Sequence, residues 1–514
     1  MKTPLLLPVL ISTAFCAVYA QDCEKLANLN LPQTKITLAQ SIPAGNFTPP
    51  EGKAIPGLPG FCRVTAVSEP SADSQINFEV WLPASGWNGK FQGIGNGGFA
   101  GAIDYSQLAH SVAHGYATAS TNTGHTAEGT DASWALHHPE KIIDFGYRAI
   151  HNTVANAKTI IEAFYGSAPK HSYFSSCSNG GRQALMEAQR YPEDYDGIIA
   201  GAPANYWTHL LANAAWDLQA LLATAESYIP AAKLPAIQAA ALASCDARDG
   251  VKDGVIEDPQ HCHFDTSVLL CKDTDSNTCL TAPQLTALNK LYSGAHTSDG
   301  KLVFPGYSPG GEAERGGWEP WVTGPAPEKS LMYMFGTQFF KNMVFNDPNW
   351  DFRSFDVNRD TKIADQKMAQ YLNATDPDLS RFQKRGGKLI LYHGWSDAAI
   401  APLGTINYYQ RIVAKMGAAQ TSEFVRLFMV PGMEHCFGGA GPDEFGQLAV
   451  GGDEKHSVDT ALEHWVEGGS APETIIASKH ERTAITRPLC AYPAVARYKG
   501  SGSTDDAENF ACAK

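Results

Sequence analysis

The stretch Ser176-Cys177-Ser178-Asn179-Gly180-Gly181 lies between a short strand predicted over 173–176 and a helix predicted over 182–190. A strand that runs through small residues directly into a helix is typical of the sharp turn that exposes a serine hydroxyl above an α/β sheet. Gly180 meets the need for a small residue, whereas Ser176 occupies a position that is usually glycine. Ser178 is therefore a candidate nucleophile, and a glycine-rich turn with an incidental serine is the competing interpretation.

Strand-like runs flank this stretch on both sides and alternate with helical ones. Strands are predicted over 76–82, 90–94, 116–120 and 197–201, and a long helix over 143–164. The strand pattern returns at 388–393 and 425–430. Because strands that alternate with helices favour parallel pairing, we expect an α/β fold whose mainly parallel sheet carries helices on both faces.

The pattern changes between 206 and 380, where an Ala/Leu-rich helical stretch is followed by a Cys/Asp-rich loop and then by aromatic-rich sequence. This segment is interpreted as an insertion in a single core. The predicted organisation is a signal peptide over 1–20, a catalytic domain over 21–205 and 381–514, and an inserted lid domain over 206–380.

Residues 1–20 are typical of a secretory signal peptide. Lys2 supplies the positive charge, 5–18 the apolar core, and Val18-Tyr19-Ala20 the cleavage site. The apolar run is too short to cross a bilayer, so we expect a soluble, secreted protein. Sequons at Asn46 and Asn373 predict surface glycans in a host that glycosylates.

The composition excludes several classes of partner. Of the 514 residues, 44% are hydrophobic and 18% are charged, which is too apolar for a disordered chain. The formal net charge is −14 and the sequence has no basic run, so neither nucleic acids nor anionic membranes are expected partners. The sequence leaves a homodimer open.

A nucleophilic serine needs donors for the oxyanion. The backbone N–H of Asn179, at the start of the helix, is one candidate. The run Gly95-Asn96-Gly97-Gly98-Phe99 follows an early predicted strand, where a hydrolase of this type places its second donor. We select Gly98, with Gly97 next, and an ordinary glycine turn is an equally good interpretation of either one.

A general base and an acid that orients it follow the last two predicted strands. Asp397 comes just after the strand over 388–393, and His435 lies in the loop after the strand over 425–430. Their order after Ser178 is that of an α/β-hydrolase. Since the chain has 16 histidines, His393 and His125 remain competitors for the role of base.

The cysteines fit this arrangement. Eleven occur, Cys16 leaves with the signal peptide, and the even number that remains favours five disulfides in an exported chain. Proximity in the sequence suggests Cys23–Cys62, Cys245–Cys262, Cys271–Cys279 and Cys490–Cys512. Cys177 and Cys436 remain, and a bridge between them would hold Ser178 and His435 together.

Cys177-Ser178, Asp397 and His435-Cys436 together resemble the paired-cysteine catalytic arrangement of the tannase and feruloyl esterase family. Further runs carry the resemblance: Cys62-Arg63-Val64, Trp87-Asn88-Gly89-Lys90-Phe91, Gly95–Gly98, Gly181-Arg182-Gln183, 190–201 and 431–436. The resemblance implies an α/β-hydrolase core with a lid inserted before the aspartate strand. It also implies the Cys177–Cys436 bridge.

Carboxylates crowd the loop that Cys245 and Cys262 bracket: Asp246, Asp249, Asp253, Glu257 and Asp258. Clustered hard oxygen ligands suit Ca²⁺, although a solvated acidic loop is the alternative. The family resemblance implies side-chain ligands from Asp246, Asp249 and Asp253 and backbone carbonyls from Val251 and Val255. We expect a structural calcium ion and no organic cofactor.

The resemblance implies a secreted serine esterase that hydrolyses hydroxycinnamic or related phenolic esters through an acyl-enzyme, with plant polysaccharides or tannins as substrates. Tannase and terephthalate-monoester hydrolase activities are the alternatives within the family. A serine carboxypeptidase-type enzyme, or an inactive calcium-stabilised protein that binds phenolics or carbohydrates, is the alternative outside it. Aromatic residues of the lid, such as Trp207, Trp318, Trp321 and Phe340, are candidates to stack on the acyl ring.

Overall fold

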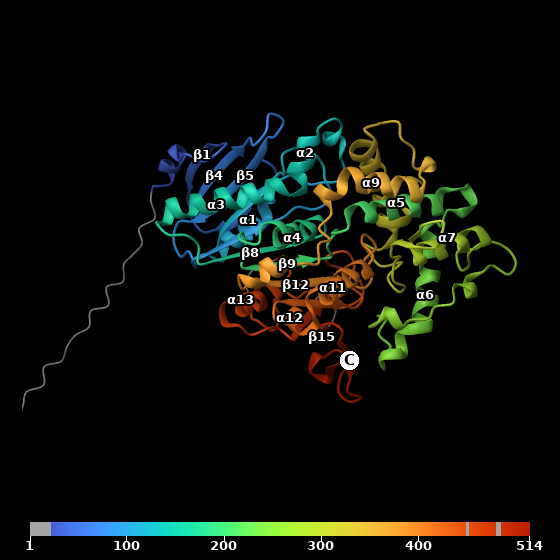
Figure 1. Ribbon diagram of the computed structural model, residues 1–514. Helices are drawn as coiled ribbons and strands as arrows, with labels where there is room; N and C mark the ends of the chain where they lie inside the picture. The colour runs from blue at the N-terminus through green and yellow to red at the C-terminus, as the bar shows by residue number, and fades with distance from the viewer. Residues whose placement is uncertain (1–21, 449–451, 480–484) are drawn as a thin grey trace, which may run out of the picture.

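The computed structural model describes residues 22–448, 452–479 and 485–514. The predicted signal peptide and Cys16 lie outside the described residues. A nine-stranded sheet has the order β1-β4-β5-β7-β6-β8-β9-β12-β13 (Figure 1). The strands are β1 (Thr34–Ile42), β4 (Phe61–Ser68), β5 (Ile76–Pro83), β6 (Lys90–Ile94), β7 (Ala117–Thr121), β8 (His171–Cys177), β9 (Gly197–Gly201), β12 (Lys388–Gly394) and β13 (Val425–Val430).

The pairing divides this sheet into two parts. Strands β1, β4, β5 and β7 pair antiparallel. Strands β7, β6, β8, β9, β12 and β13 pair parallel. The predicted mainly parallel α/β sheet is confirmed, and the antiparallel strands extend it at one edge.

Alternate side chains of the central strands enter different cores, because successive residues of a strand point to opposite faces. In β12, Leu389 and Leu391 belong to the core beneath α3 (Ala149–Tyr165), α4 (Asn179–Arg190) and α11 (Leu403–Met416). Ile390 and Tyr392 pack instead with α13 (Val458–Gly468). The helix α1 (Tyr105–Ala113) packs against Trp81 of β5, so helices cover both faces of the sheet.

Between β9 and β12 the chain leaves the sheet and forms a helical segment, which contains the range 206–380 predicted as an insertion. Its helices are α5 (Trp207–Leu222), α6 (Leu234–Cys245), α7 (Ala282–Ser293), α8 (Leu331–Gln338), α9 (Val357–Leu372) and α10 (Ser380–Lys384). Figure 1 shows α5, α6, α7 and α9 grouped at one end of the molecule. Two separate hydrophobic cores stabilise this segment.

Candidate active site

Ser178 forms the turn between β8 and α4, with a φ of 66°. This left-handed backbone is uncommon for a residue other than glycine, and it is the conformation in which a strand-to-helix elbow presents its nucleophile. The side chain of Ser178 is partly exposed, whereas its neighbours Cys177 and Asn179 are buried. The local structure therefore offers one hydroxyl at the top of the sheet.

Ser176 occupies the elbow position that is usually glycine, and two glycines make room for it. A Cβ on Gly180 would overlap the Ser176 side chain, and a Cβ on Gly95 would come within 2.6 Å of its Oγ. Since real Cβ atoms essentially never approach so closely, both positions require glycine while Ser176 is present. The departure from the usual pattern is accommodated without loss of the elbow.

Asp397 and His435 meet above the parallel strands. Asp397 follows β12 and His435 follows β13, and the carboxyl ends of these neighbouring parallel strands lie at one edge of the sheet. The His435 Nδ1 lies 2.8 Å from the Asp397 Oδ2. Asp397 is 1% exposed, and its Oδ1 accepts the backbone N–H groups of Ala399 and Ile400, each at 2.8 Å. The imidazole is thereby held with its Nε2 free to accept a proton.

The charge of Asp397 is stabilised despite its burial. Burial acts to raise the pKa of this carboxyl, but the charge of His435 and the hydrogen bonds from His393 and His435 outweigh it. The pKa of Asp397 is therefore held well below its usual value. Burial, together with the charge of Asp397, raises the pKa of the adjacent Glu434 well above its ordinary value. This shift disfavours a second negative charge beside Asp397.

The two competing histidines have other partners. His393 is fully buried, with Nδ1 2.7 Å from the Thr405 Oγ1 and Nε2 2.9 Å from the Ile400 carbonyl oxygen. Its Nε2 is also 3.1 Å from the Asp397 Oδ2, so His393 supports the carboxylate. His125 stacks on Trp134 with ring centroids 3.7 Å apart, and burial lowers its pKa to about 4. Both ring nitrogens of His393 are occupied, and His125 is bonded through its Nε2 to the Phe99 carbonyl, so neither ring is available as the base in the way that His435 is.

All five predicted disulfides are present: Cys23–Cys62, Cys177–Cys436, Cys245–Cys262, Cys271–Cys279 and Cys490–Cys512. The Cys177–Cys436 bridge joins residues separated by 259 positions, with Cα atoms 6.1 Å apart. Ser178 follows one half-cystine directly and His435 precedes the other. The bridge therefore fastens the two loops that carry the candidate nucleophile and base.

The candidate oxyanion donors lie in adjoining segments. Asn179 is the first residue of α4, where backbone N–H groups lack partners within the helix. The side-chain amide of Asn179 donates to the Asn96 carbonyl at 3.2 Å, and the Asn96 N–H donates to the Gln183 Oε1 at 2.9 Å. The Gly95–Gly98 run is thereby held against α4. Gly98 has a φ of 54° and faces the Gly129 carbonyl at a distance that excludes a Cβ.

Aromatic side chains form a row from the oxyanion run to the candidate base. The Trp321 ring meets the His435 ring edge-to-face at 5.0 Å, Phe335 stacks on Trp321 at 6.1 Å, and Phe99 lies 5.3 Å from Phe335. Trp321 and Phe335 are partly exposed. Of the stacking candidates chosen from the sequence, Trp318, Phe340 and Trp207 are buried in hydrophobic cores instead. Phe335 is an addition that the sequence did not indicate, and Phe99 is itself buried behind it.

The acidic loop folds around Asp246, which is 5% exposed. Its two carboxylate oxygens accept the N–H groups of Asp253 and Gly254, each at 3.2 Å. Asp249 accepts the Val251 N–H at 2.8 Å, and Asp253 accepts the Val255 N–H at 3.2 Å. Arg487 pairs with Asp253 at 2.6 Å and leaves the cluster net negative. Three carboxylates and the carbonyls of Val251 and Val255 are the donor chemistry that Ca²⁺ prefers, and an ion would have to draw the three carboxylates closer together than they lie in this structure.

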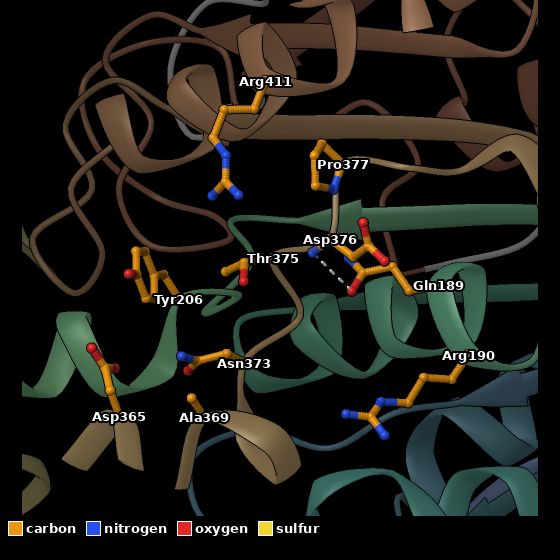
Figure 2. Close-up of a pocket in the computed structure, with 10 residues that line it drawn as sticks. All are labelled: Gln189, Arg190, Tyr206, Asp365, Ala369, Asn373, Thr375, Asp376, Pro377 and Arg411. Carbon is orange, nitrogen blue, oxygen red and sulfur yellow. Dashed lines mark hydrogen bonds between the residues drawn. The ribbon is translucent and has the colours of Figure 1, made fainter. Parts of the chain in front are cut away.

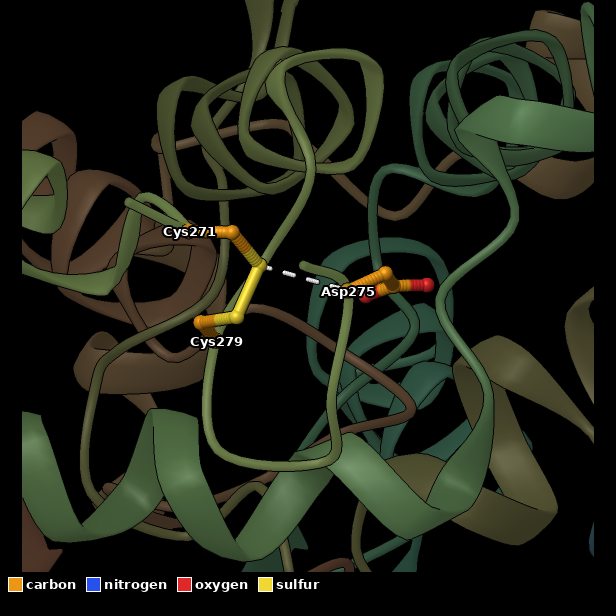
Figure 3. Close-up of side chains that lie close together, drawn as sticks. All are labelled: Cys271, Asp275 and Cys279. Atoms are coloured by element: carbon orange, nitrogen blue, oxygen red, sulfur yellow. Dashed lines mark hydrogen bonds between the residues drawn. A yellow bond between two sulfur atoms is a disulfide. The ribbon is translucent and has the colours of Figure 1, made fainter. Parts of the chain in front are cut away.

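Two groups of potential metal ligands lie close together within the described residues. In the first, shown in Figure 3, Cys271 and Cys279 are joined in a disulfide beside Asp275, so neither sulfur is a thiolate. In the second, His151 lies 2.7 Å from Asp194 near the buried Glu187. The Lys158 ammonium donates to the Asp194 carbonyl and already brings a positive charge to the group. We assign no metal to either.

The two sequons differ in accessibility. Asn46 lies in the short strand β2 (Gly45–Phe47) and is exposed. Asn373 is partly buried, and its side-chain amide donates to the Thr208 Oγ1 at 2.9 Å. Across the described ranges, we find no helix long and apolar enough to cross a membrane.

Comparison with known proteins agrees with this geometry. Residues 62–513 match the family model described as tannase and feruloyl esterase. An uncharacterized esterase of Xanthomonas campestris is 44% identical and aligns with 95% of this chain and 91% of its own. A probable feruloyl esterase B-2 of Aspergillus terreus is 33% identical over 99% of this chain and 98% of its own.

Solved structures extend the similarity to three dimensions. The crystal structure of feruloyl esterase B from Aspergillus oryzae has a TM-score of 0.88 and 32% identity, and covers 96% of this chain and 99% of its own. The tannin acyl hydrolase of Aspergillus niger shares the fold, with a TM-score of 0.76 and 22% identity over 94% of this chain and 92% of its own. The chain belongs to the tannase and feruloyl esterase family and is a carboxylic ester hydrolase with an α/β-hydrolase fold.

Proposed function

We propose that this protein is a secreted feruloyl esterase-type enzyme that works through an acyl-enzyme with Ser178, His435 and Asp397 as its catalytic residues. The observation that carries the proposal is the placement of His435, which is held by Asp397 on one side and tied by the Cys177–Cys436 bridge to the Ser178 elbow on the other. An alcohol next to an oriented imidazole is the arrangement that nucleophilic ester hydrolysis requires.

The reaction proceeds in two acyl transfers. The Ser178 Oγ attacks the ester carbonyl while the His435 Nε2 takes its proton, and Asp397 stabilises the imidazolium that forms. The N–H groups of Asn179 and Gly98 stabilise the oxyanion. His435 then gives the proton to the departing alcohol, and it next deprotonates the water that releases the aromatic acid. The polar pocket of about 650 Å³ that opens beside Gly95–Gly97 offers room for the alcohol.

The acyl ring is assigned to the partly exposed rings of Phe335 and Trp321, with the buried Phe99 packed behind Phe335. Trp321 contacts the candidate base and Phe335 stacks on Trp321, and two such rings suit a planar aromatic acid. A methoxy group is compatible with such an apolar surface, whereas the three galloyl hydroxyls need polar partners. The names of the fungal relatives support the feruloyl preference. Tannase and terephthalate-monoester hydrolase activities remain the alternatives, and parallel assays with the three types of ester distinguish them.

We expect kcat/KM for methyl ferulate to exceed that for methyl gallate by about tenfold or more, because unpaired hydroxyls oppose binding to an apolar surface. Parallel assays with these two esters and with a terephthalate monoester make the measurement. A higher value for methyl gallate would assign the enzyme to the tannases, and a higher value for the terephthalate monoester would assign it to that class.

A protein that keeps the fold without activity, binding phenolics or carbohydrates, is the alternative from another class. A fluorophosphonate probe forms a covalent bond only with an activated serine. Labelling of the wild-type protein at Ser178 supports the enzyme, whereas an unlabelled, folded protein that binds ferulate would support the alternative. Hydrolysis of peptides in preference to esters would instead indicate a carboxypeptidase.

Secretion and glycosylation are part of the same proposal. Five disulfides suit an oxidising, extracellular environment, and the fungal relatives are consistent with export. We place the glycans on Asn46 and Asn373 in hosts that glycosylate.

A structural calcium ion, held by Asp246, Asp249 and Asp253 with the carbonyls of Val251 and Val255, completes the proposal. The ion would neutralise the loop between Cys245 and Cys262 and stabilise it. These residues belong to the inserted segment, and the catalytic residues follow strands of the sheet.

Chelation of calcium is expected to lower Tm while leaving the turnover of each folded molecule nearly unchanged, because binding to the folded state alone stabilises it. Differential scanning calorimetry with EGTA, alongside activity normalised to active sites titrated with the fluorophosphonate, makes the comparison. An Asp249→Asn variant should show the lower Tm without EGTA. A loss of turnover in molecules that stay folded would contradict a purely structural role.

A further inference from the structure

A second pocket lies where the inserted segment joins the sheet domain (Figure 2), and Ser178, Asp397 and His435 are not among the residues that line it. Its volume is about 640 Å³, within the usual range for small-molecule sites. Tyr206 lines it from the connection between β9 and α5. The return after α9 contributes Asn373, Thr375, Asp376 and Pro377. The sheet domain contributes Gln189 and Arg190 from the end of α4 and Arg411 from α11.

The wall of this pocket is ordered by hydrogen bonds between the two connections. The Ala374 N–H donates to the Asn205 carbonyl at 2.8 Å, and the Thr208 N–H donates to the Asn373 Oδ1 at 3.0 Å. The Gln189 side chain accepts the Asp376 N–H at 3.3 Å, which is the dashed line of Figure 2. A wall braced in this way is formed before any ligand binds, which lowers the entropic cost of binding.

One charged group in the pocket lacks a partner. Asp365 bonds to His209 at 3.0 Å, and Asp376 accepts the Asp378 N–H at 2.9 Å. The Arg190 guanidinium lies 4.4 Å from the Tyr147 ring centroid and donates to the Gln370 carbonyl. Arg411 makes no hydrogen bond or ion pair to any described residue, and Figure 2 shows its guanidinium directed into the space. The pocket therefore contains one unpaired positive charge, on Arg411, whose planar guanidinium can donate two parallel hydrogen bonds to a carboxylate.

Hydroxyl groups surround this charge. The hydroxyls of Tyr206 and Thr375 have no hydrogen-bond partner among the described residues, and the Tyr206 ring stacks on His209 with centroids 3.7 Å apart. The Arg411 guanidinium would pair with one anionic group of a ligand. The hydroxyls of Tyr206 and Thr375 can both donate and accept hydrogen bonds, so they would bind hydroxyl groups of the same ligand. The pocket is too large for a carboxylate alone and too polar for a fatty chain.

We propose that this pocket is an accessory binding site for a uronic-acid residue, with the sugar carboxylate on Arg411 and sugar hydroxyls on Tyr206 and Thr375. The site is not catalytic, since none of its residues belongs to the triad. It would hold the enzyme on an acidic polysaccharide while the ester site acts elsewhere on the polymer.

Isothermal titration calorimetry with D-galacturonate and D-glucuronate measures binding at this site without any use of esterase activity. A negative result would therefore refute the accessory site and leave the proposed esterase function untouched. The protein is produced in a host without N-glycosylation, because Asn373 lines the same pocket. We expect at least one of the two uronates to bind, neither glucose nor acetate to bind comparably, and Arg411→Gln to weaken binding by about tenfold or more. Arg411→Lys, which keeps the charge without the fork, should bind with intermediate affinity.

Lys415→Gln is the matched control, since Lys415 lies one turn along α11, is exposed and pairs with Asp378 at 3.4 Å. It should bind the uronate as the wild type does. Absence of binding by both uronates, equal affinity in Arg411→Gln and wild type, or equal affinity for acetate would each overturn the proposal.

Discussion

Replacement of Ser178 by alanine is expected to lower kcat on methyl ferulate by about 10⁴- to 10⁶-fold, because it removes the only atom that bonds to the acyl group. The elbow itself should persist: its space is set by Gly95, Gly180 and Ser176, and alanine is smaller than serine. Circular dichroism and Tm should therefore match those of the wild type. The fluorophosphonate label should disappear together with the activity.

Ser175→Ala is the matched control for this prediction. Ser175 lies three residues earlier in β8, is 1% exposed, and its hydroxyl has no partner among the described side-chain and backbone groups. Its removal should leave kcat within a few-fold of the wild type. Turnover retained by Ser178→Ala at the wild-type level would mean that another residue attacks the ester.

The second large effect is expected from Cys177→Ala/Cys436→Ala, in which both half-cystines are removed so that no thiol is left. The bridge joins positions 259 residues apart, and in the chain-entropy model its loss lowers the free energy of unfolding by about 5 kcal/mol. Molecules that still fold should also lose about 10²-fold in kcat, because Ser178 and His435 are no longer fastened to each other.

The Cys271→Ala/Cys279→Ala variant separates these two consequences. That bridge lies in the inserted segment (Figure 3) and joins positions only 8 residues apart, so the same model gives about 2.5 kcal/mol. Its loss should lower stability without changing kcat. Urea denaturation and activity per titrated active site measure both quantities. An unchanged kcat in the Cys177/Cys436 variant would show that the bridge only stabilises the fold.

The parallel part of the sheet could be predicted because its strands are short, uninterrupted segments. Their pairing with neighbouring strands has no register shift. The strands predicted over 90–94, 197–201 and 425–430 have the same bounds as β6, β9 and β13. The strand β1 was not predicted, since a register shift between Ile36 and Leu38 breaks the alternation that marks a strand. Its pairing with β4 is also a contact between distant residues, which local patterns do not contain.

The helix predicted over 143–164 starts at a different residue in the structure, for a reason that the sequence pattern does not contain. The structure has a widened turn over Asp144–Arg148 before α3 begins at Ala149. Gly146 in this turn faces the Tyr371 carbonyl, within 2.5 Å of where a Cβ would stand. That close approach comes from the end of α9 in the inserted segment. A tertiary contact of this kind leaves no trace in helical periodicity.

The positions of Ser178, Asp397 and His435 could be chosen from order and spacing, because each follows a recognisable strand. The role of His393 could not, since the difference between it and His435 lies in the partners of their ring nitrogens. The aromatic side chains near the site could not be chosen from the sequence for the same reason. Trp318 and Trp321 are three positions apart, yet only the packing decides that the first is buried and the second meets His435.

The insertion between β9 and β12 also sets the order in which the molecule matures during biosynthesis. A ribosome that adds about 5–20 residues per second needs about 13 to 50 seconds to travel the 259 positions from Cys177 to Cys436. The nascent chain carries its serine but no base during that time. The proposed nucleophile is therefore made well before its proposed base, and the two can meet only after the chain beyond β13 has been synthesised.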